Sequence, residues 1–292
     1  LKKLIKNCPK NFKNLKIKGL SQDSRSLKKG DLFFAIKGEK FNGERFIKKA
    51  ILNGAKAIVC SSRCKFLSKK IAIIKTKRLK ETLIFACKNF FKNKPKNIIA
   101  VTGTNGKTSV AGFYNQLLTL NKIPVATIGT LGIIRGKKIN KSNLTSPDII
   151  SLHKELQKLK EKKIENVIIE ASSHGLHQGR LEGINFRAGI FTNFTQDHLD
   201  YHKSMKNYLN AKLILFNKLL KKKSYIILDE NNKEFEKLKK IAKKRKLKII
   251  SITKQSYCKE INNSKLVGEF QIKNLLMAIL AGKLSMLKDK KI

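Results

Sequence analysis

The sequence lacks the long apolar runs that membrane insertion and secretion require. No stretch approaches 18 consecutive uncharged apolar residues, which excludes a transmembrane helix. The basic N-terminal segment LKKLIKNCPKN has no apolar core, so we expect no signal peptide. The five cysteines are scattered, and the spacing of Cys60 and Cys64 matches no zinc-binding pattern. This usage is typical of reduced thiols, and we expect a cytoplasmic protein.

Acidic residues are scarce, and so is arginine. The chain has 20 Asp and Glu against 65 Lys and Arg, a net charge of +45, and only 8 of the basic residues are Arg. A large positive charge invites a nucleic-acid interpretation. Nucleic-acid sites favour Arg for paired contacts with phosphates and bases, however, and the lysines here are spread along the whole chain. We therefore expect a lysine-rich surface and no nucleic-acid partner.

The length of 292 residues allows two domains. We expect a small mixed α/β domain over residues 1–94, followed by a polar linker around KNKPKN (92–97), and a larger domain over residues 95–292. The expected elements of the first domain are strands at 31–36 and 55–60 and a helix at 45–55.

The larger domain alternates strands with helices. Such alternation predicts a doubly wound, mostly parallel sheet of the P-loop NTPase-like type. The expected strands are 98–103, 124–129, 166–172, 188–193, 224–229 and 248–253, and the expected helices are 107–121, 146–162, 207–220, 234–248 and 267–286.

A phosphate-binding loop is predicted within IIAVTGTNGKTSVAGFY (98–114). A strand that runs through glycines into a helix directs backbone N–H groups and the positive end of the helix dipole at one point, which suits an anion. Lys107 would reach the phosphates, and the Thr108 hydroxyl would bind Mg²⁺. The strict Walker pattern fails because Val101 stands where it requires Gly, and the alternative is a glycine-rich turn of any α/β protein. We favour a nucleoside triphosphate site formed by Gly103, Thr104, Asn105, Gly106, Lys107, Thr108 and Ser109.

Acidic residues and histidines gather after two of the predicted strands. Four of the five histidines fall within residues 174–202, together with Asp197 and Asp200, and Glu170 ends the strand before them. Ligands of parallel sheets bind at the carboxyl ends of the strands, where the phosphate loop also opens. Glu170 is therefore a candidate Mg²⁺ ligand, since phosphoryl transfer needs a cation held by carboxylates. The alternative for each histidine is a local cap or pair.

Several stretches resemble the Mur ligases. GTNGKTS is similar to the ATP loop of these enzymes and of their folylpolyglutamate synthase relatives. DSRSLKKGDLFFAIKGEKFNGERFI (23–47) resembles the UDP-binding domain of the Mur ligases. TIGTLG (127–132), LTSPD (144–148) and the block EASSHGLHQGRLEGINFRAGIFTNFTQDHLDYH (170–202) resemble the branch that adds diaminopimelate or lysine. The resemblance covers roughly residues 20 to 282.

The resemblance implies roles for individual residues. Lys107, Glu170, His198 and Lys212 match catalytic positions, and Lys212 matches a lysine that is carbamylated in the family, which requires a depressed pKa. Thr108, Glu170, His198 and Lys212 would bind metal, Asn274 would lie near adenine, and His174, His177 and His202 would support the site.

The substrate residues also follow from the resemblance. The uridine-diphosphate pocket would include Gln22, Ser24, Glu39, Lys40 and Phe41, and the sugar-linked substrate would contact Thr145, Ser146, Ser172, Gln178 and Arg180. Two departures are visible: Leu144 stands where diaminopimelate-adding enzymes can carry Asn, and Glu39-Lys40-Phe41 differs from the usual polar set. Without the family, Ser24 and Thr145 would be interpreted as turn or cap residues.

The implied reaction is an ATP- and Mg²⁺-dependent ligation in peptidoglycan precursor synthesis. A carboxylate of UDP-N-acetylmuramoyl-L-alanyl-D-glutamate takes the γ-phosphate of ATP. The amine of a diamino acid, with meso-diaminopimelate favoured, then displaces phosphate from the acyl phosphate. No membrane partner is implied. The choice between diaminopimelate and lysine and the oligomeric state are left open by the sequence.

Mur ligases carry a third domain, which binds the amino acid. Only ten residues follow position 282, so we expect that domain to be absent and this chain not to complete the ligation alone. A separately encoded C-terminal domain would then be a partner. Two alternatives are a folylpolyglutamate synthase-like ligase and a non-catalytic remnant that binds nucleotide or UDP-sugar.

Overall fold

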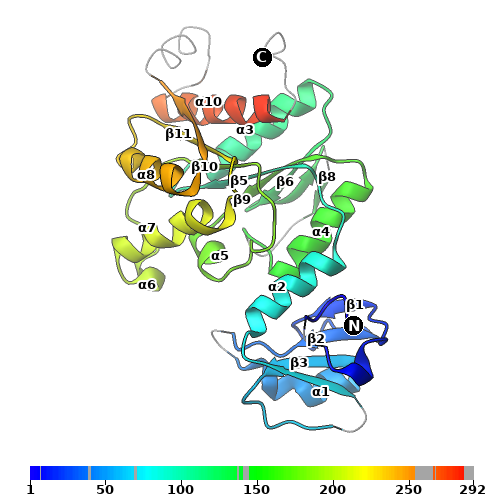
Figure 1. Cartoon of the computed structure of the whole chain (residues 1–292). Helices are drawn as coiled ribbons and strands as arrows, with labels where there is room; N and C mark the ends of the chain where they lie inside the picture. Colours follow the sequence, from blue (N-terminus) through cyan, green and yellow to red (C-terminus); the bar gives the residue numbers. More distant parts are fainter. Residues whose placement is uncertain are drawn as a thin grey trace. The chain divides into compact units, whose positions relative to one another are not determined.

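The computed structural model describes residues 1–6, 8–38, 41–68, 71–136, 138–140, 145–253, 266 and 268–285. The chain divides into two compact units, one formed by residues 1–92 with 149–154 and the other by residues 93–148 with 155–292 (Figure 1). The expected boundary between residues 94 and 95 differs from this division. Ile149 and Ile150 belong to the hydrophobic cluster of the first unit, and this packing assigns residues 149–154 to it.

The N-terminal unit is built on a parallel four-stranded sheet in the order β1-β2-β3-β4. Leu32 and Phe34 of β2 enter one hydrophobic cluster, whereas Phe33 between them enters another, so both faces of the sheet are covered. The strands are β1 (Gly19–Ser21), β2 (Asp31–Phe34), β3 (Ala57–Ser61) and β4 (Ala72–Thr76), and the helices are η1 (Lys10–Phe12), η2 (Gly43–Phe46), α1 (Ile47–Leu52) and α2 (Leu79–Phe90).

The larger unit contains an eight-stranded sheet in the order β12-β11-β10-β5-β9-β6-β7-β8. The strands from β12 to β6 run parallel, and β7 and β8 add an antiparallel hairpin at one edge. The expected doubly wound, mostly parallel sheet is therefore confirmed. The strands are β5 (Asn97–Thr102), β6 (Val125–Gly129), β7 (Gly132–Arg135), β8 (Lys138–Asn140), β9 (Asn166–Glu170), β10 (Ala188–Phe191), β11 (Tyr225–Asp229) and β12 (Lys248–Ile252).

Helices cover both faces of this sheet. α3 and α10 pack together on one face, and α5 and α7 lie on the other (Figure 1). Ile99 and Val101 of β5 share a buried cluster with Val110 of α3 and Met277 of α10. The helices are α3 (Lys107–Leu120), α4 (Ile149–Glu161), α5 (Ser173–His177), α6 (Leu199–His202), α7 (Met205–Ile214), the π-helix η3 (Leu215–Leu219), α8 (Phe235–Arg245) and α10 (Glu269–Leu284).

Some elements differ from the sequence predictions. The helix expected at 207–220 is α7 followed by one π-helical segment, where Leu215 and Phe216 pack closely over the bare backbone of Gly189. The strands β1, β4, β7 and β8 and the helix α2 were not predicted. Three of these strands have only three or four residues, too few for a clear periodic signal.

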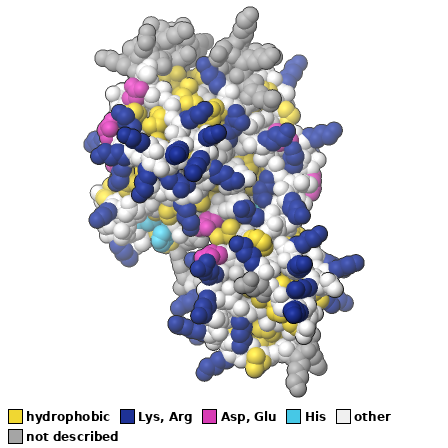
Figure 2. Space-filling model, in the orientation of Figure 1, with side chains coloured by type: hydrophobic (Ala, Val, Ile, Leu, Met, Phe, Trp, Pro, Cys, Tyr) yellow, Lys and Arg dark blue, Asp and Glu magenta, His cyan; other side chains and the backbone are white. Residues whose placement is uncertain are grey.

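Lysine and arginine side chains are distributed over the face shown in Figure 2 rather than gathered in one patch. Within the described part of the chain, no helix is both long enough and apolar enough to cross a membrane.

A buried hydrogen bond between Tyr114 and Ser285 gives a test of the α3–α10 packing. The two hydroxyls lie 2.7 Å apart. Tyr114→Phe leaves the Ser285 hydroxyl without this partner, and we expect the free energy of unfolding in urea to fall by roughly 1–3 kcal/mol. Adding Ser285→Ala should recover much of the loss, because neither polar group then remains. A double variant as unstable as, or less stable than, the single variant would contradict this account.

Candidate active site

The phosphate loop lies between β5 and α3, as the sequence predicted. Gly103 has φ +148° and Gly106 has φ +84°, conformations that favour glycine. A Cβ atom on Gly103 would collide with the hydroxyl of Thr192, and one on Gly106 would lie 2.6 Å from Oδ1 of Asn274. Both glycines are therefore required by their backbone conformation and by their neighbours.

The segment after β10 holds the loop in shape. The backbone N–H of Thr104 donates to the carbonyl of Asn193 at 2.9 Å, and that of Asn105 donates to Oδ1 of the same residue at 2.9 Å. The Thr192 hydroxyl donates to the carbonyl of Asn105 at 2.6 Å. Sequence reasoning assigned no role to Thr192 or Asn193, although both lie in the block that resembles the family. These three bonds tie the loop to the segment that follows β10.

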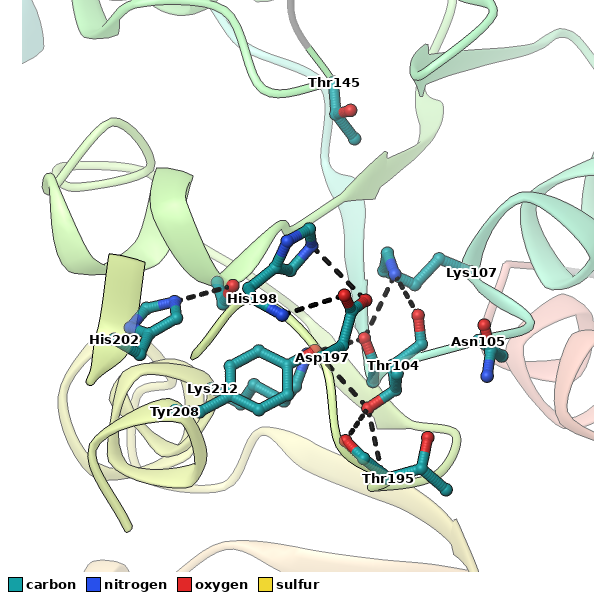
Figure 3. A network of polar contacts seen from close by, with 12 residues as sticks. Thr104, Asn105, Lys107, Thr145, Thr195, Asp197, His198, His202, Tyr208 and Lys212 are labelled. Atoms are coloured by element: carbon teal, nitrogen blue, oxygen red, sulfur yellow. Dashed lines mark hydrogen bonds and ion pairs between the residues drawn. The ribbon is translucent and has the colours of Figure 1, made fainter. Parts of the chain in front are cut away.

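The Thr104 side chain is fixed from a second direction (Figure 3). Its hydroxyl donates to the carbonyl of Thr195 at 3.1 Å and accepts from the Thr195 N–H at 3.0 Å. The buried Tyr208 hydroxyl also donates to it, at 3.4 Å. Tyr208 comes from α7, so this contact joins the loop to that helix.

Lys107 folds back over the loop. Its Nζ donates to the carbonyls of Gly103 at 3.1 Å and Thr104 at 2.7 Å. Burial lowers the pKa of Lys107, while the charges of Glu170 and Asp197 oppose that change. The Lys107 ammonium therefore donates to two backbone carbonyls of the loop. The oxygens of a bound phosphate could take the place of these carbonyls as acceptors.

Glu170 ends β9 and is 3% exposed. Its Oε2 accepts from the hydroxyls of Thr108 at 2.9 Å and Thr130 at 3.1 Å, and its Oε1 accepts from the N–H of Thr130 at 3.1 Å. A side chain on Gly129 would overlap the carboxylate, so glycine is needed there. Sequence reasoning predicted Glu170 and Thr108 but assigned no role to Gly129 or Thr130.

Thr108 and Glu170 fit a magnesium ion. Both offer oxygen ligands, they lie within hydrogen-bonding distance of each other, and Mg²⁺ is commonly bound by one or two protein oxygens together with phosphates and water. Within the described ranges no cluster of three or more His, Cys, Asp or Glu residues could hold a metal. The pair would therefore hold Mg²⁺ jointly with a bound phosphate group.

His198 lies in a tight turn beside Asp197. Its backbone has φ +52°, its N–H donates to Oδ1 of Asp197 at 2.8 Å, and its ring Nε2 lies 3.4 Å from Oδ2. Both side chains are partly exposed, and Figure 3 shows the imidazole beside the carboxylate. The carboxylate orients the imidazole, as a second-layer partner commonly does for a metal-binding histidine.

Lys212 is buried, with 1% of its surface exposed. Its Nζ donates to the Gly103 carbonyl at 2.7 Å and lies 4.2 Å from the centre of the Tyr208 ring. Burial, followed by repulsion from Lys107, lowers the pKa of Lys212 to about 7, and Asp197 opposes the shift. An ammonium has no lone pair for a metal, so Lys212 could become a metal ligand only after losing its proton.

His174, His177 and His202 form a cluster of tilted and edge-on rings with Tyr201. The His174 ring lies 4.1 Å from the Tyr201 ring, and His177 Nδ1 lies 2.9 Å from the Tyr201 hydroxyl. His202 is buried, with Nε2 3.0 Å from the Ser173 hydroxyl, and burial together with the neighbouring histidines lowers its pKa to about 4. His202 is therefore neutral near pH 7.

The candidate substrate residues of the larger unit surround Ser146. The fully buried Ser146 hydroxyl donates to the Glu170 carbonyl at 2.9 Å, and Nη1 of Arg180 donates to the Ser146 carbonyl at 2.9 Å. The Thr145 hydroxyl lies 3.2 Å from that of Thr130. Ser172 caps α5 by accepting from the Gly175 N–H, and Gln178 donates to the Tyr201 hydroxyl.

The remaining candidate site residues that the structure describes belong to α10, to α3 and to the N-terminal unit. Asn274, on α10, is buried and lies against Gly106. In the N-terminal unit Ser24 is buried, Gln22 is half-buried, and Phe41 is 66% exposed with an edge contact to Phe46. Ser109 lies in the first turn of α3. Glu39, Lys40 and Leu144 lie outside the described residues.

A parallel sheet whose glycine-rich loop opens onto a helix, beside a threonine and a buried carboxylate, defines a P-loop α/β protein. The family described as "Mur ligase middle domain" matches residues 101–263, and "Mur ligase family, catalytic domain" matches residues 16–90. The first match covers more than half of the chain, and the chain therefore belongs to the Mur ligase family. The resemblance inferred from the sequence motifs is confirmed.

The chain is similar to named ligases over most of its length. It is 37% identical over 300 residues to the UDP-N-acetylmuramoyl-L-alanyl-D-glutamate--2,6-diaminopimelate ligase of Rickettsia montanensis, covering 94% of this chain and 62% of that protein. The ligase of the same name from Bradyrhizobium diazoefficiens is 42% identical over 209 residues, which cover 70% of this chain and 42% of that protein. The chain thus spans less than two thirds of these relatives.

A solved structure shares the fold. The structure of a UDP-N-acetylmuramoyl-L-alanyl-D-glutamate--2,6-diaminopimelate ligase superposes with a TM-score of 0.76 at 25% identity, covering 93% of this chain and 60% of that one.

Two glycines of the same region provide a matched test of the loop geometry. Gly106→Ala places a side chain at φ +84° against Asn274, and we expect the free energy of unfolding to fall by about 1–2 kcal/mol. Gly112→Ala, inside α3 with open space around it, should instead raise it by roughly 0.5–1 kcal/mol. Denaturant titration measures both. Equal effects at the two positions would contradict a special role for Gly106.

Proposed function

We propose that the chain carries the UDP-binding and ATP-binding domains of an ATP-dependent ligase of peptidoglycan precursor synthesis. The ligase adds a diamino acid, with meso-diaminopimelate favoured, to UDP-N-acetylmuramoyl-L-alanyl-D-glutamate. One observation carries the proposal: Lys107, Thr108 and Glu170 lie at the carboxyl edge of the sheet, with the buried Lys212 bonded to the same loop. The names of the similar ligases support the substrate and the diamino acid.

In the first step, a carboxylate oxygen of the dipeptide attacks the γ-phosphorus of ATP. The new P–O bond forms as the bond from the γ-phosphorus to the bridging oxygen breaks, and ADP leaves. The loop N–H groups and Lys107 stabilise the charge on the phosphate oxygens. Mg²⁺ bound at Thr108 and Glu170 would neutralise further charge on those oxygens.

In the second step, the amine of the diamino acid attacks the acyl carbon. The C–N bond forms, phosphate leaves, and the amine loses a proton. His198, Asp197 and Lys212 lie beside the loop. With Lys212 carbamylated, these side chains would orient the acyl phosphate and complete the metal site. The N-terminal unit, with Gln22, Ser24 and Phe41, would bind the uridine diphosphate.

The alternatives have less support. A folylpolyglutamate synthase-like ligase would share the loop chemistry, but the similar proteins described above are diaminopimelate ligases. A non-catalytic remnant would have little reason to keep Lys107, Thr108, Glu170, His198 and Lys212 together in one site.

Calorimetry of the whole chain tests the proposed function. We expect Mg·ATP to bind, and UDP-N-acetylmuramoyl-L-alanyl-D-glutamate, but not a folate, to bind to protein that holds a non-hydrolysable ATP analogue. Lys107→Ala should weaken nucleotide binding on the order of 10- to 100-fold, because a charged hydrogen-bond donor to the phosphates is lost.

Lys206→Ala is the matched control, because Lys206 is an exposed lysine in the first turn of α7. It should bind Mg·ATP as the wild type does. If the wild type binds no nucleotide, or if Lys107→Ala binds it equally well, the proposal is wrong.

The low pKa of Lys212 predicts a modification that depends on CO₂ and on pH. The neutral amine adds CO₂ and releases a proton, which gives a carbamate. Because the pKa of Lys212 is about 7 rather than 10.5, the carbamate should increase as the pH rises from 6 to 8. The measurement is ¹³C NMR of protein in ¹³C-bicarbonate. The signal should vanish in Lys212→Gln and persist in Lys206→Gln; an unchanged signal in Lys212→Gln would refute the assignment.

A further inference from the structure

Thr130 lies between two parts of the site and contacts both. It follows β6, its side chain is exposed, and none of the site roles inferred from the sequence belongs to it. Its hydroxyl donates to Oε2 of Glu170 at 3.1 Å and also lies 3.2 Å from the Thr145 hydroxyl. Glu170 belongs to the proposed metal site, whereas Thr145 is a candidate contact of the sugar-linked substrate.

Both ends of this link are held in place. Glu170 is buried, and its carboxylate occupies the space that Gly129 leaves open. Thr145 precedes Ser146, whose buried hydroxyl donates to the main-chain carbonyl of Glu170. The carboxylate and the Thr145 backbone are therefore both tied to the end of β9, and Thr130 fills the gap between them.

The direction of the hydrogen bonds follows from the proton count. An ionised carboxylate only accepts, so the single hydroxyl proton of Thr130 is used toward Glu170. The contact with Thr145 then requires Thr145 to donate its proton to the Thr130 oxygen. The lone pairs of the Thr145 oxygen remain available to an N–H or O–H donor from a ligand. Chains of this kind strengthen when a further donor is added at the end, because each bond polarises the next.

We propose that Thr130 is a positioning residue that couples binding of the UDP-linked substrate at Thr145 to the Glu170 carboxylate of the nucleotide site. A substrate donor to Thr145 strengthens the bonds from Thr145 to Thr130 and from Thr130 to Glu170. The carboxylate is then held more firmly for the Mg·nucleotide. By linkage, each ligand raises the affinity for the other by the same factor. The inference rests on the proposed function, because it uses both ligands.

Calorimetry measures the coupling without turnover. The dissociation constant of a Mg-bound non-hydrolysable ATP analogue is determined with and without saturating UDP-N-acetylmuramoyl-L-alanyl-D-glutamate. We expect the substrate to tighten nucleotide binding by about five-fold or more in the wild type. Thr130→Val keeps the backbone N–H and the side-chain shape but removes the hydroxyl, and the tightening should fall below about two-fold. Thr130→Ser restores the hydroxyl and should restore the coupling.

Thr145→Val provides a second, independent variant. It should lose the coupling as Thr130→Val does, and the double variant should lose no more than either single variant, because both interrupt one chain. Unchanged thermal unfolding would show that the variants are folded. A Thr130→Val protein that keeps the wild-type coupling would overturn the inference. Wild-type protein that binds both ligands without coupling would overturn it and leave the proposed function intact, whereas wild-type protein that binds neither would overturn both.

Discussion

Two lysine ammonium groups converge on the carbonyl oxygen of Gly103. Lys107 reaches it from the start of α3 at 3.1 Å, and Lys212 reaches it from α7 at 2.7 Å. The carbonyl is available to both because Gly103 adopts φ +148° and, having no side chain, allows the Thr192 hydroxyl to approach its backbone closely. Burial of Lys212, together with its proximity to the Lys107 cation, explains the low pKa of Lys212. One peptide group of the loop thus binds a lysine from α3 and a lysine from α7.

The parallel sheet brings the other groups to the same place. β5, β9, β6 and β10 are neighbours or near neighbours, and their carboxyl ends deliver the phosphate loop, Glu170, Gly129-Thr130 and Thr192 respectively. Residues that are remote in sequence therefore become hydrogen-bond partners: Thr130 and Glu170 are 40 positions apart, and Tyr208 and Thr104 are 104 apart. The sheet order makes these contacts possible.

A feature of the site could be predicted from the sequence when the pattern that marks it lies within a few neighbouring residues. The loop and Glu170 were found because a strand, a turn and a helix leave a pattern within a few residues. Lys212 is one of 57 lysines, and only resemblance distinguished it, because its burial depends on α7 packing beside the loop. Thr130, Thr192 and Tyr208 were not assigned, since their roles are hydrogen bonds to remote segments. The same dependence on local signals applies to the large sheet. The alternation of strands and helices predicted its parallel strands, but the short β7–β8 hairpin was not predicted.

Lys107 and Glu170 both have hydrogen-bond partners within the protein, and this affects the free energy gained when a ligand binds. Lys107 rests on loop carbonyls, and Glu170 accepts from Thr108 and Thr130. A phosphate oxygen that takes Lys107 therefore exchanges one polar contact for another instead of meeting a bare buried charge. The net gain per exchanged contact is modest, about 1 kcal/mol for neutral partners and about 1.5–3 kcal/mol where one is charged. Tight binding must then come from many exchanges made together on a loop whose shape is held by its bonds with Asn193, Thr192 and Thr195.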